Sequence, residues 1–339
     1  MGNCCCSNNC DDVNIPLSST TPTNQNNTIN TANSDDLIEF ILSNNNDEYP
    51  LPNDKRLNEI DPLELPHYLN RQIWNANFTS PIHMSLSNKR FHVLDFGCGK
   101  GTWILDMATK YPNSNFIGID KSLIYPPRDR IKQMNVTFLY LKSLEDKLTF
   151  DKNAFHFVHL RYLNLDLPKA NWTILINKLL KVLKKPSDGD DGYIEICEWD
   201  LVTFNSGPVT KTLFKFGIEP IIGETLEQLL KEKTDHLTDI TVQKKYFPIG
   251  SWPRVKARRR QPSFSINFDS NNNSNSRLKR IGSLKLKELL KLLNNLKPHL
   301  LNCMGINDKE FDDMIKSFIK EVDIHKTFGQ EIRIYARKT

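Results

Sequence analysis

Long apolar segments are missing from this sequence of 339 residues. No run reaches the ~18 apolar residues that a membrane-spanning helix needs, and no apolar segment typical of a signal peptide follows Met1. Apolar residues make up 39% of the chain and the formal net charge is only +5, so charge alone does not indicate a nucleic-acid partner. We therefore expect a cytoplasmic protein with no specific nucleic-acid partner.

The sequence also lacks cysteine pairs at the spacing of a zinc site. The chain has seven cysteines, but they form no Cys-x-x-Cys pair and no histidine-rich segment accompanies them. A structural zinc site is therefore not indicated, and the sequence predicts no metal site. Four cysteines fall within the first ten residues, and Cys98, Cys197 and Cys303 are scattered. In the cytoplasm all of these thiols would stay reduced.

Residues 1–46 are rich in Asn, Ser and Thr, and we expect a disordered tail because such a segment buries too little apolar surface to offset the entropy of ordering. Its first residues, MGNCCCS, resemble a lipidation signal, although Cys6 stands where N-myristoylation favours Ser or Thr. Myristoylation of Gly2 with palmitoylation of Cys4, Cys5 or Cys6 would hold the protein at a membrane surface. The alternative is a low-complexity tail in which the cysteines have no such role.

Residues 93–120, VLDFGCGKGTWILDMATKYPNSNFIGID, have the pattern of a βαβ unit. Two short apolar runs flank a glycine turn and about a dozen residues at helical spacing. The first run ends at Asp95 and the second at Asp120. The turn contains Gly97, Gly99 and Gly101. Because parallel strands end at one edge of a sheet, the two carboxylates and the turn predict a nucleoside-binding crevice at that edge.

The charges in this unit narrow the choice of nucleoside. A pyrophosphate-binding turn needs Gly-x-Gly-x-x-Gly and no adjacent carboxylate. Here the third glycine comes one position early, Thr102 takes its place, and Asp95 precedes the turn. A Walker motif is also absent. The sulfonium and ammonium groups of S-adenosylmethionine gain from nearby carboxylates, so this ligand is favoured over NAD and an NAD-dependent oxidoreductase is a disfavoured alternative.

Strand and helix patterns continue on both sides of this unit. Residues 55–78 carry apolar side chains at helical spacing and predict a helical cap within residues 47–88. Further strands are expected at Val136–Leu141, Phe155–Leu160, Tyr193–Glu198 and Glu331–Arg337, and further helices at Trp172–Leu183, Val209–Lys233, Leu284–Leu301 and Phe311–Val322. Residues 253–280, with a basic run and an Asn-rich stretch, predict a mobile insertion. The basic run could be a nuclear address, a membrane contact or part of a solvated loop.

These motifs resemble those of class I S-adenosylmethionine-dependent methyltransferases, most closely the fungal small-molecule and secondary-metabolism type with a methyltransferase domain 25-like core. The matching segments are VLDFGCGKGTW with the following GID, LPHYLNRQIWNANFTSP, FHFVHLRYL, KVLK, GYIEICEWD and YARK. The resemblance implies one methyltransferase domain over residues 47–339. Its α/β fold would be a Rossmann-like, doubly wound, mostly parallel sheet with an antiparallel C-terminal strand and helices on both faces.

The resemblance also implies S-adenosylmethionine as the cofactor and assigns residues to it. The residues around the methionine moiety and the helix start would be Asp95, Gly97, Cys98, Gly99 and Gly101. Asp120 would bind the ribose, and Lys121 would flank the adenine. The residues along the adenine edge would be Ser143, Leu144 and Glu145. His159 and Arg161 would face the methyl group at the end of the next strand, and Tyr68 would cap the cofactor.

The chain departs from the family pattern at two positions, one in the cofactor site and one just before a strand of the sheet. Lys142 stands where the family often has Asp or Asn to contact the adenine amino group, and His156 replaces a frequent Asp before the next strand. These departures favour an alternative function, a non-catalytic S-adenosylmethionine-binding regulatory protein.

The main functional hypothesis is in-line methyl transfer to a small-molecule acceptor. The principal task of such a protein is to hold acceptor and methyl group in a near-attack geometry. A general base is needed only for some acceptors. His159 is the first candidate for this base, because we expect it near the carboxyl edge of a strand and imidazole titrates near neutrality. Glu198 and Asp200 are the second candidates for the same positional reason.

The lipidation hypothesis predicts a change in membrane partitioning. Gly2→Ala removes the acceptor of an N-terminal myristoyl group, and without it acylation of the neighbouring cysteines alone anchors less stably. We expect the variant to move from the membrane to the soluble fraction of cell lysates, measured by ultracentrifugation and immunoblotting. A variant that sediments with membranes as well as the wild-type protein contradicts the hypothesis.

Overall fold

The computed structural model describes most of the chain from Glu64 onward. The described segments are residues 64–126, 131, 134–187, 190–215, 222–233, 235–253 and 272–339. The predicted tail with its lipidation signal, the first part of the predicted cap, and residues 254–271 of the predicted insertion lie outside the described residues. The expectations for these segments therefore stay predictions.

A seven-stranded sheet forms the centre of the molecule, with strand order β3-β2-β1-β4-β5-β7-β6. The strands are β1 (His92–Phe96), β2 (Asn115–Asp120), β3 (Val136–Tyr140), β4 (Phe157–Arg161), β5 (Tyr193–Phe204), β6 (Leu237–Pro248) and β7 (Phe328–Lys338). Strands β1 to β5 pair in parallel, and β7 is antiparallel to both β5 and β6. The predicted mostly parallel sheet with an antiparallel C-terminal strand is confirmed.

The central parallel strands are short apolar runs because both of their faces are covered. Val93 and Leu94 of β1 and Phe157 and Val158 of β4 are fully buried. From β1 the chain runs to β2 and β3 on one side, and it then continues on the other side with β4 and β5. The strand order therefore reverses between β1 and β4. In such sheets, ligands bind beyond the carboxyl ends of the strands at this point.

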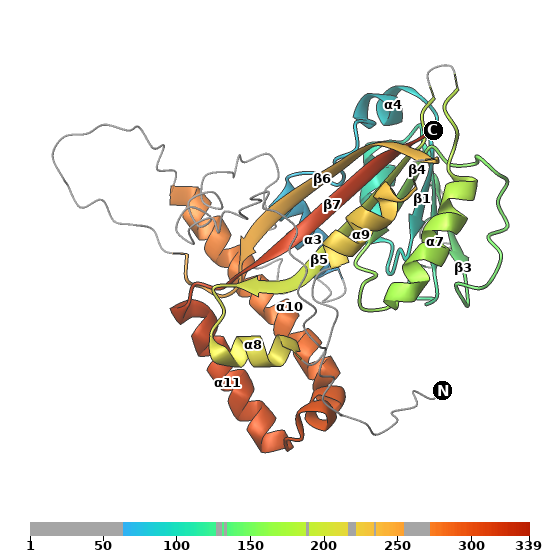
Figure 1. Ribbon diagram of the computed structural model, residues 1–339. Coiled ribbons are helices and arrows are strands. Elements are labelled where there is room, and N and C mark those ends of the chain that lie inside the picture. Colours follow the sequence, from blue (N-terminus) through green and yellow to red (C-terminus); the bar gives the residue numbers. More distant parts are fainter. Residues whose placement is uncertain are drawn as a thin grey trace, which may run out of the picture.

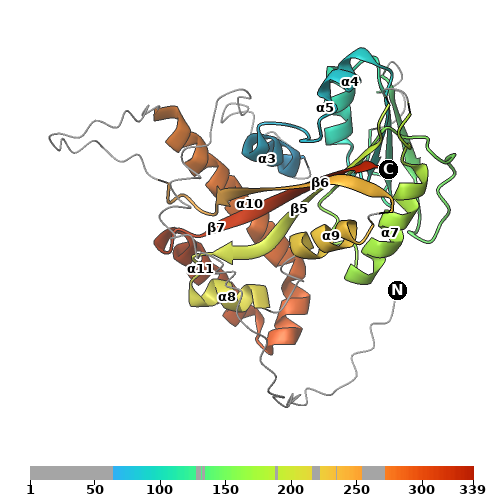
Figure 2. The ribbon, with the colours of Figure 1, turned by 45° about the horizontal axis from the view of Figure 1, so that its top comes forward.

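Helices cover both faces of the sheet (Figures 1 and 2). On one face, α4 (His83–Asn88) and α5 (Thr102–Lys110) contribute to an apolar core in which Trp103 packs with Phe116 and Phe138. On the other face, α7 (Lys169–Val182) and α9 (Ile222–Lys231) belong to a second apolar core. The expected helices on both faces are confirmed.

A third group of helices lies beyond the end of β5, in the lower part of Figure 1. It consists of α8 (Pro208–Lys215), α10 (Asn272–Met304) and α11 (Asp308–Ile324), and α3 (Leu65–Trp74) contacts α10. Leu213, Leu289 and Phe318 pack in its apolar core. Asn307 and Glu310 form a capping box that starts α11. None of the described helices is both long and apolar enough to cross a membrane.

Two elements differ from the sequence prediction. Helix α10 begins at Asn272 instead of Leu284, so residues 272–280 of the predicted mobile insertion are helical. Strand β6 was not predicted, because its polar sequence LTDITVQKKYFP lacks a regular apolar alternation. The ladder to β7 is also interrupted between Thr238 and Thr241, where Asp239 has a φ of 54°. An edge strand tolerates such a break and such polar side chains.

A buried carboxylate, Glu331 of β7, connects several of these elements. Its Oε1 accepts hydrogen bonds from Tyr162 Oη at 2.6 Å and from Lys285 Nζ of α10 at 3.0 Å. Its Oε2 accepts from Asn70 Nδ2 and Trp74 Nε1 of α3, each at 2.9 Å. Both Glu331 and Lys285 are fully buried, and Lys285 Nζ also lies 3.0 Å from Glu288 Oε2. This group therefore ties α3, α10 and the end of β4 to the sheet.

Breaking this group is expected to destabilise the protein strongly. Lys285→Ala leaves the Glu331 carboxylate buried without its cation, which costs about 3–5 kcal/mol of unfolding free energy. Urea unfolding followed by circular dichroism measures this loss. The matched control is Lys287→Ala, which removes an exposed lysine of the same helix and should change the unfolding free energy by less than about 0.5 kcal/mol. Equal stabilities of the two variants would contradict the assigned role of Lys285.

Candidate functional site

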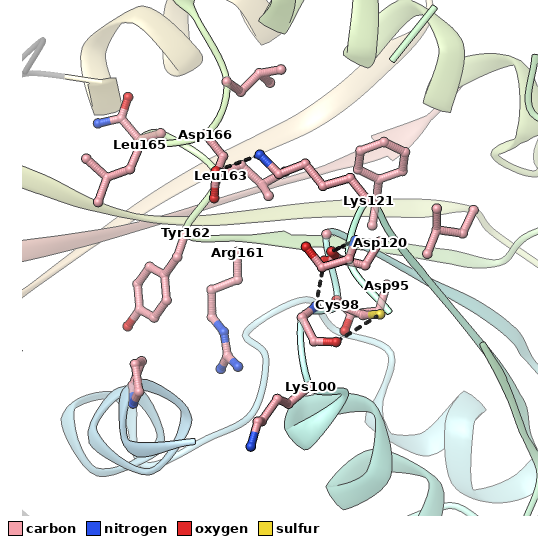
Figure 3. Close-up of a pocket in the computed structure, with 18 of the residues that line it drawn as sticks. Asp95, Cys98, Lys100, Asp120, Lys121, Arg161, Tyr162, Leu163, Leu165 and Asp166 are labelled. Atoms are coloured by element: carbon pink, nitrogen blue, oxygen red, sulfur yellow. Dashed lines mark hydrogen bonds and ion pairs between the residues drawn. The ribbon is translucent and has the colours of Figure 1, made fainter. Parts of the chain in front are cut away.

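A cavity of about 770 Å³ opens at the carboxyl ends of the parallel strands (Figure 3). One half is lined by the turn after β1 and by residues that follow β2 and β3. The other half is lined by residues 161–167, Glu198 and Trp199, and four residues of α10. Its volume lies in the upper part of the range of about 300–1,000 Å³ that is typical of small-molecule sites.

The turn after β1 has a conformation that depends on glycine. Gly99 has a φ of 54°, and a Cβ atom there would meet no other atom within 4 Å. Gly101 has a φ of 76°, and a Cβ atom there would collide with the ring of Phe138. Gly101 thus lets α5 start close to the sheet, while Gly99 leaves open space at the cavity. A ligand can approach the backbone at Gly99.

The carboxylate of Asp120, at the end of β2, holds this turn. Its Oδ2 accepts a hydrogen bond from Gly99 N at 2.8 Å, and its Oδ1 accepts one from Ser122 N at 2.7 Å. Figure 3 shows Asp120 beside the turn at the wall of the cavity. The neighbouring Lys121 forms an exposed ion pair with Asp166, with 2.7 Å between Nζ and Oδ1. This pair joins the two halves of the lining.

His159 lies beneath the cavity and does not line it. Its Nδ1 is 2.7 Å from Asp95 Oδ1, its ring stacks on Trp103 with 3.8 Å between centroids, and only 1% of the residue is exposed. Burial lowers its pKa, against the raising effect of Asp95. The expectation that His159 faces an acceptor as a general base is therefore corrected: the buried imidazole orients Asp95, which does line the cavity.

Glu198, one of the two second candidates for the general base, lines the cavity. Its Oε1 accepts from Leu163 N at 2.7 Å and its Oε2 from Asn164 N at 3.3 Å, so it orders the loop after β4. Burial raises the pKa of Glu198 to about 8, although the two backbone hydrogen bonds act in the opposite direction. The other second candidate, Asp200, accepts from Gly223 N and Gln330 Nε2 and is not part of the lining.

Arg161 lines the cavity next to a chain of charged and polar groups from α3 and α5. Its two terminal nitrogens each lie 3.3 Å from His67 Nδ1, and His67 Nε2 lies 3.3 Å from Asp106 Oδ2. Burial lowers the pKa of His67 to about 4. Burial alone would raise the pKa of Asp106, but its hydrogen bonds from His67 and Asn77 and the charge of Arg71 lower it to about 2.

The cavity brings together ten of the twelve residues that were predicted to bind the cofactor. These ten are Asp95, Gly97, Cys98, Gly99, Asp120, Lys121, Ser143, Leu144, Glu145 and Arg161. The exceptions are Gly101, which packs behind the turn, and Tyr68. The side chain of Tyr68 is offset by one helical position, and its neighbour His67 lines the cavity instead. The thiol of Cys98 is neutral, because burial raises its pKa well above the usual value.

Several lining residues were missed by the sequence analysis. They are the loop residues 163–167, and Glu288, Lys291, Leu292 and Asn295 of α10. The spacing of the four α10 residues is the only signal that could have marked them, because it places them on one side of the helix. Nothing in the sequence indicates that this side faces the turn after β1, which is about 190 residues earlier in the chain.

Three comparisons relate the chain to known proteins. Residues 93–186 match the family described as a methyltransferase domain. The methyltransferase pytC of Aspergillus terreus is 28% identical over 222 residues, which are 61% of this chain and 62% of that protein. The secondary metabolism regulator laeA of Aspergillus niger is 32% identical over 113 residues, 33% of this chain and 28% of that protein. The chain thus spans less than two thirds of the length of these relatives.

Among solved structures, a similar one is phosphoethanolamine N-methyltransferase 2 of Haemonchus contortus, in complex with phosphomonomethylethanolamine and S-adenosylhomocysteine. The sequence identity is 16% and the TM-score is 0.42, over 81% of this chain and 59% of that one.

The raised pKa of Glu198 predicts a pH-dependent stability. Between the unfolded value near 4.5 and the folded value of about 8, the folded protein holds a proton that the unfolded chain does not. The unfolding free energy contributed by Glu198 is therefore fully present below pH 4.5 and is lost as the pH rises to 8, by about 1.4 kcal/mol per pH unit.

Glu198→Gln removes this titration while keeping a neutral side chain of the same shape. Urea unfolding between pH 5.5 and 7.5 should show that the stability of the wild-type protein falls relative to that of the variant as the pH rises. Glu232→Gln, at an exposed position of the described chain, is the control and should follow the wild-type profile. Parallel profiles for the wild-type and Glu198→Gln proteins would contradict the assigned protonation.

Proposed function

Since residues 93–186 match a methyltransferase domain, we propose that the chain transfers the methyl group of S-adenosylmethionine to a small-molecule acceptor. The observation that carries the proposal is the joint position of the glycine turn and the carboxylates of Asp95 and Asp120 at one cavity. A cavity of about 770 Å³ is large enough for a donor and an acceptor to lie side by side.

The residues at the turn fit the donor. S-adenosylmethionine carries a sulfonium and an ammonium group, and both are stabilised by the carboxylates that line this part of the cavity. Gly99 provides the open space that a side chain would fill. The donor supplies an electrophilic methyl group on a sulfonium with a good leaving group.

The protein's own residues bind and orient. The hydrogen bonds from Gly99 and Ser122 fix the direction of the Asp120 carboxylate, whose remaining lone pairs would accept hydrogen bonds from the ribose hydroxyls. His159 fixes Asp95 from below. Residues 143–145, after β3, would lie along the adenine edge. The loop after β4 and α10 would hold the acceptor, so that its nucleophilic atom approaches the methyl group in line.

A second candidate function is a regulatory protein that binds the donor without turnover. Two observations favour it: a relative is named a secondary metabolism regulator, and Lys142 lines the cavity at a position where the resemblance implies an adenine contact through Asp or Asn. The two functions differ in one measurable property, which is the appearance of methylated product.

The experiment that separates these functions uses donor with a radiolabelled methyl group. The purified full-length protein is incubated with this donor and a small-molecule extract of the source cells, and labelled products are separated by chromatography. Labelled product that is absent with Gly99→Arg protein supports the transferase. Calorimetric binding of the donor without any labelled product supports the regulator, and binding of NADH but not of the donor would contradict both.

The proposed donor site predicts the effects of two substitutions. Gly99→Arg places a long side chain into the open space at the turn and should abolish binding of S-adenosylhomocysteine while the circular dichroism spectrum stays unchanged. Asp120→Ala should weaken binding by about 1–3 kcal/mol, the range for hydrogen bonds to a charged group. Isothermal titration calorimetry measures both effects.

The control for Asp120 is Asp151→Asn, which removes an exposed carboxylate outside the cavity lining and should bind S-adenosylhomocysteine like the wild-type protein. Unchanged affinity of the Asp120→Ala protein would refute the ribose-binding role.

A further inference from the structure

The guanidinium group of Arg161 brings a positive charge to the lining of the cavity. Figure 3 shows this side chain directed away from the sheet, between those of Tyr162 and Lys100. Within the described part of the chain, its polar partner is His67 Nδ1, and its other contact is the ring of Tyr162 with 5.5 Å between Cζ and the ring centroid. No carboxylate among the described residues forms an ion pair with it.

The ring of His67 explains why Asp106 does not balance this charge. Asp106 is the nearest acidic group along this chain of contacts, but it already accepts hydrogen bonds from Arg71 and Asn77. Between Asp106 and Arg161 stands a histidine whose pKa is lowered to about 4 by burial. The histidine is therefore neutral at pH 7, with Nε2–H toward Asp106 and the lone pair of Nδ1 toward Arg161. It orients the guanidinium group but does not neutralise it.

Donors remain available around Arg161 for a ligand. An arginine has five N–H donors, and the contact with His67 uses one on each terminal nitrogen. Asn164, which also lines the cavity, has a buried Nδ2 with no hydrogen-bond partner in the described part of the chain. A buried donor without a partner costs free energy, and a ligand with anionic oxygens would satisfy both groups.

Apolar side chains lie in the same half of the cavity as these donors, beside the carboxyl groups of Glu198 and Glu288. The same half of the cavity is lined by Leu163, Leu165, Leu167, Ile174 and Leu292. Two of them, Leu165 and Ile174, are about half exposed at the mouth. Apolar side chains at a mouth favour a ligand that buries them.

Resting on the proposed methyl transfer, we propose that Arg161 and Asn164 bind the carboxylate of the acceptor, and that the acceptor is an apolar carboxylic acid. A carboxylate matches the fork of one guanidinium group through two parallel hydrogen bonds. A phosphate monoester, with about twice the charge, is disfavoured because the carboxylate of Glu288 lines the same half. The carboxylate of the donor could bind Arg161 in place of the carboxylate of the acceptor, and the test separates these two cases.

The test measures binding by isothermal titration calorimetry at pH 7, with the full-length protein saturated with S-adenosylhomocysteine. The probes are octanoate, its neutral analogue octanamide, and octyl phosphate. We expect octanoate to bind at least tenfold more tightly than the other two. Arg161→Gln should weaken octanoate binding by about 10- to 100-fold, and Arg161→Lys should recover part of it, because the charge returns without the fork. Asn164→Leu should also weaken octanoate binding.

A control and three outcomes make the test decisive. Lys181→Gln removes an exposed positive charge on α7, outside the cavity lining, and should bind octanoate like the wild-type protein. Octanoate that binds no better than octanamide, or that binds Arg161→Gln equally well, overturns the proposal. Tighter binding of octyl phosphate overturns the choice of a carboxylate. Loss of S-adenosylhomocysteine binding in Arg161→Gln with octanoate unaffected assigns the arginine to the donor instead.

Failure of this inference can be told apart from failure of the proposed function. If the wild-type protein binds S-adenosylhomocysteine and methylates an extract component but shows no preference for octanoate, the proposed methyl transfer stands and the proposed carboxylic acid acceptor is refuted. If the wild-type protein does not bind S-adenosylhomocysteine, both proposals are refuted.

Discussion

Much of the architecture depends on one interaction, the contact of the buried Glu331 carboxylate with a lysine and three neutral donors. Its two oxygens receive groups from α3, α10 and the residue after β4. Burying a carboxylate away from water costs free energy unless all of its acceptor positions receive hydrogen bonds. The folded protein therefore has to bring these segments together at one place, although they are separated by more than 250 residues in sequence at the widest. That place lies directly behind the second half of the cavity.

The two halves of the cavity are consequently held by different means. In the first half, the turn after β1 is fixed by local backbone hydrogen bonds, since Gly97 N and Cys98 N both donate to Ile119 O. In the second half, Tyr162 is fixed by Glu331, and the backbone of Leu163 and Asn164 is fixed by Glu198. The first arrangement needs only a βαβ unit. The second needs the whole sheet, and it can differ between proteins that share the first.

This division explains what the sequence could predict. The turn between Asp95 and Asp120 was recognisable because a short stretch contains both its glycines and its carboxylates, and these residues do meet at the cavity. The misplacement of His159 has a physical cause: a position near a strand end does not tell whether a side chain points into the crevice or into the core beneath it, and here Trp103 and Asp95 hold it in the core. The cofactor contact predicted for Tyr68 is one residue off, because each residue along a helix is rotated by about 100° from the one before it. His67 lines the cavity instead. The contribution of α10 follows from tertiary packing that no local pattern encodes.

The place of β7 in the sheet has a consequence for how the protein is made. Strands β5 and β6 are not neighbours; each pairs with β7, which leaves the ribosome about 80 residues after β6. At synthesis rates of about 5–20 residues per second, β6 waits several seconds with both of its backbone edges unpaired, and Glu331 is not yet present to receive Lys285. The βαβ unit around the glycine turn can form long before that. During translation, the half of the cavity that would hold the donor thus precedes the half that would hold the acceptor, and the nascent chain exposes unpaired strand edges until β7 is made.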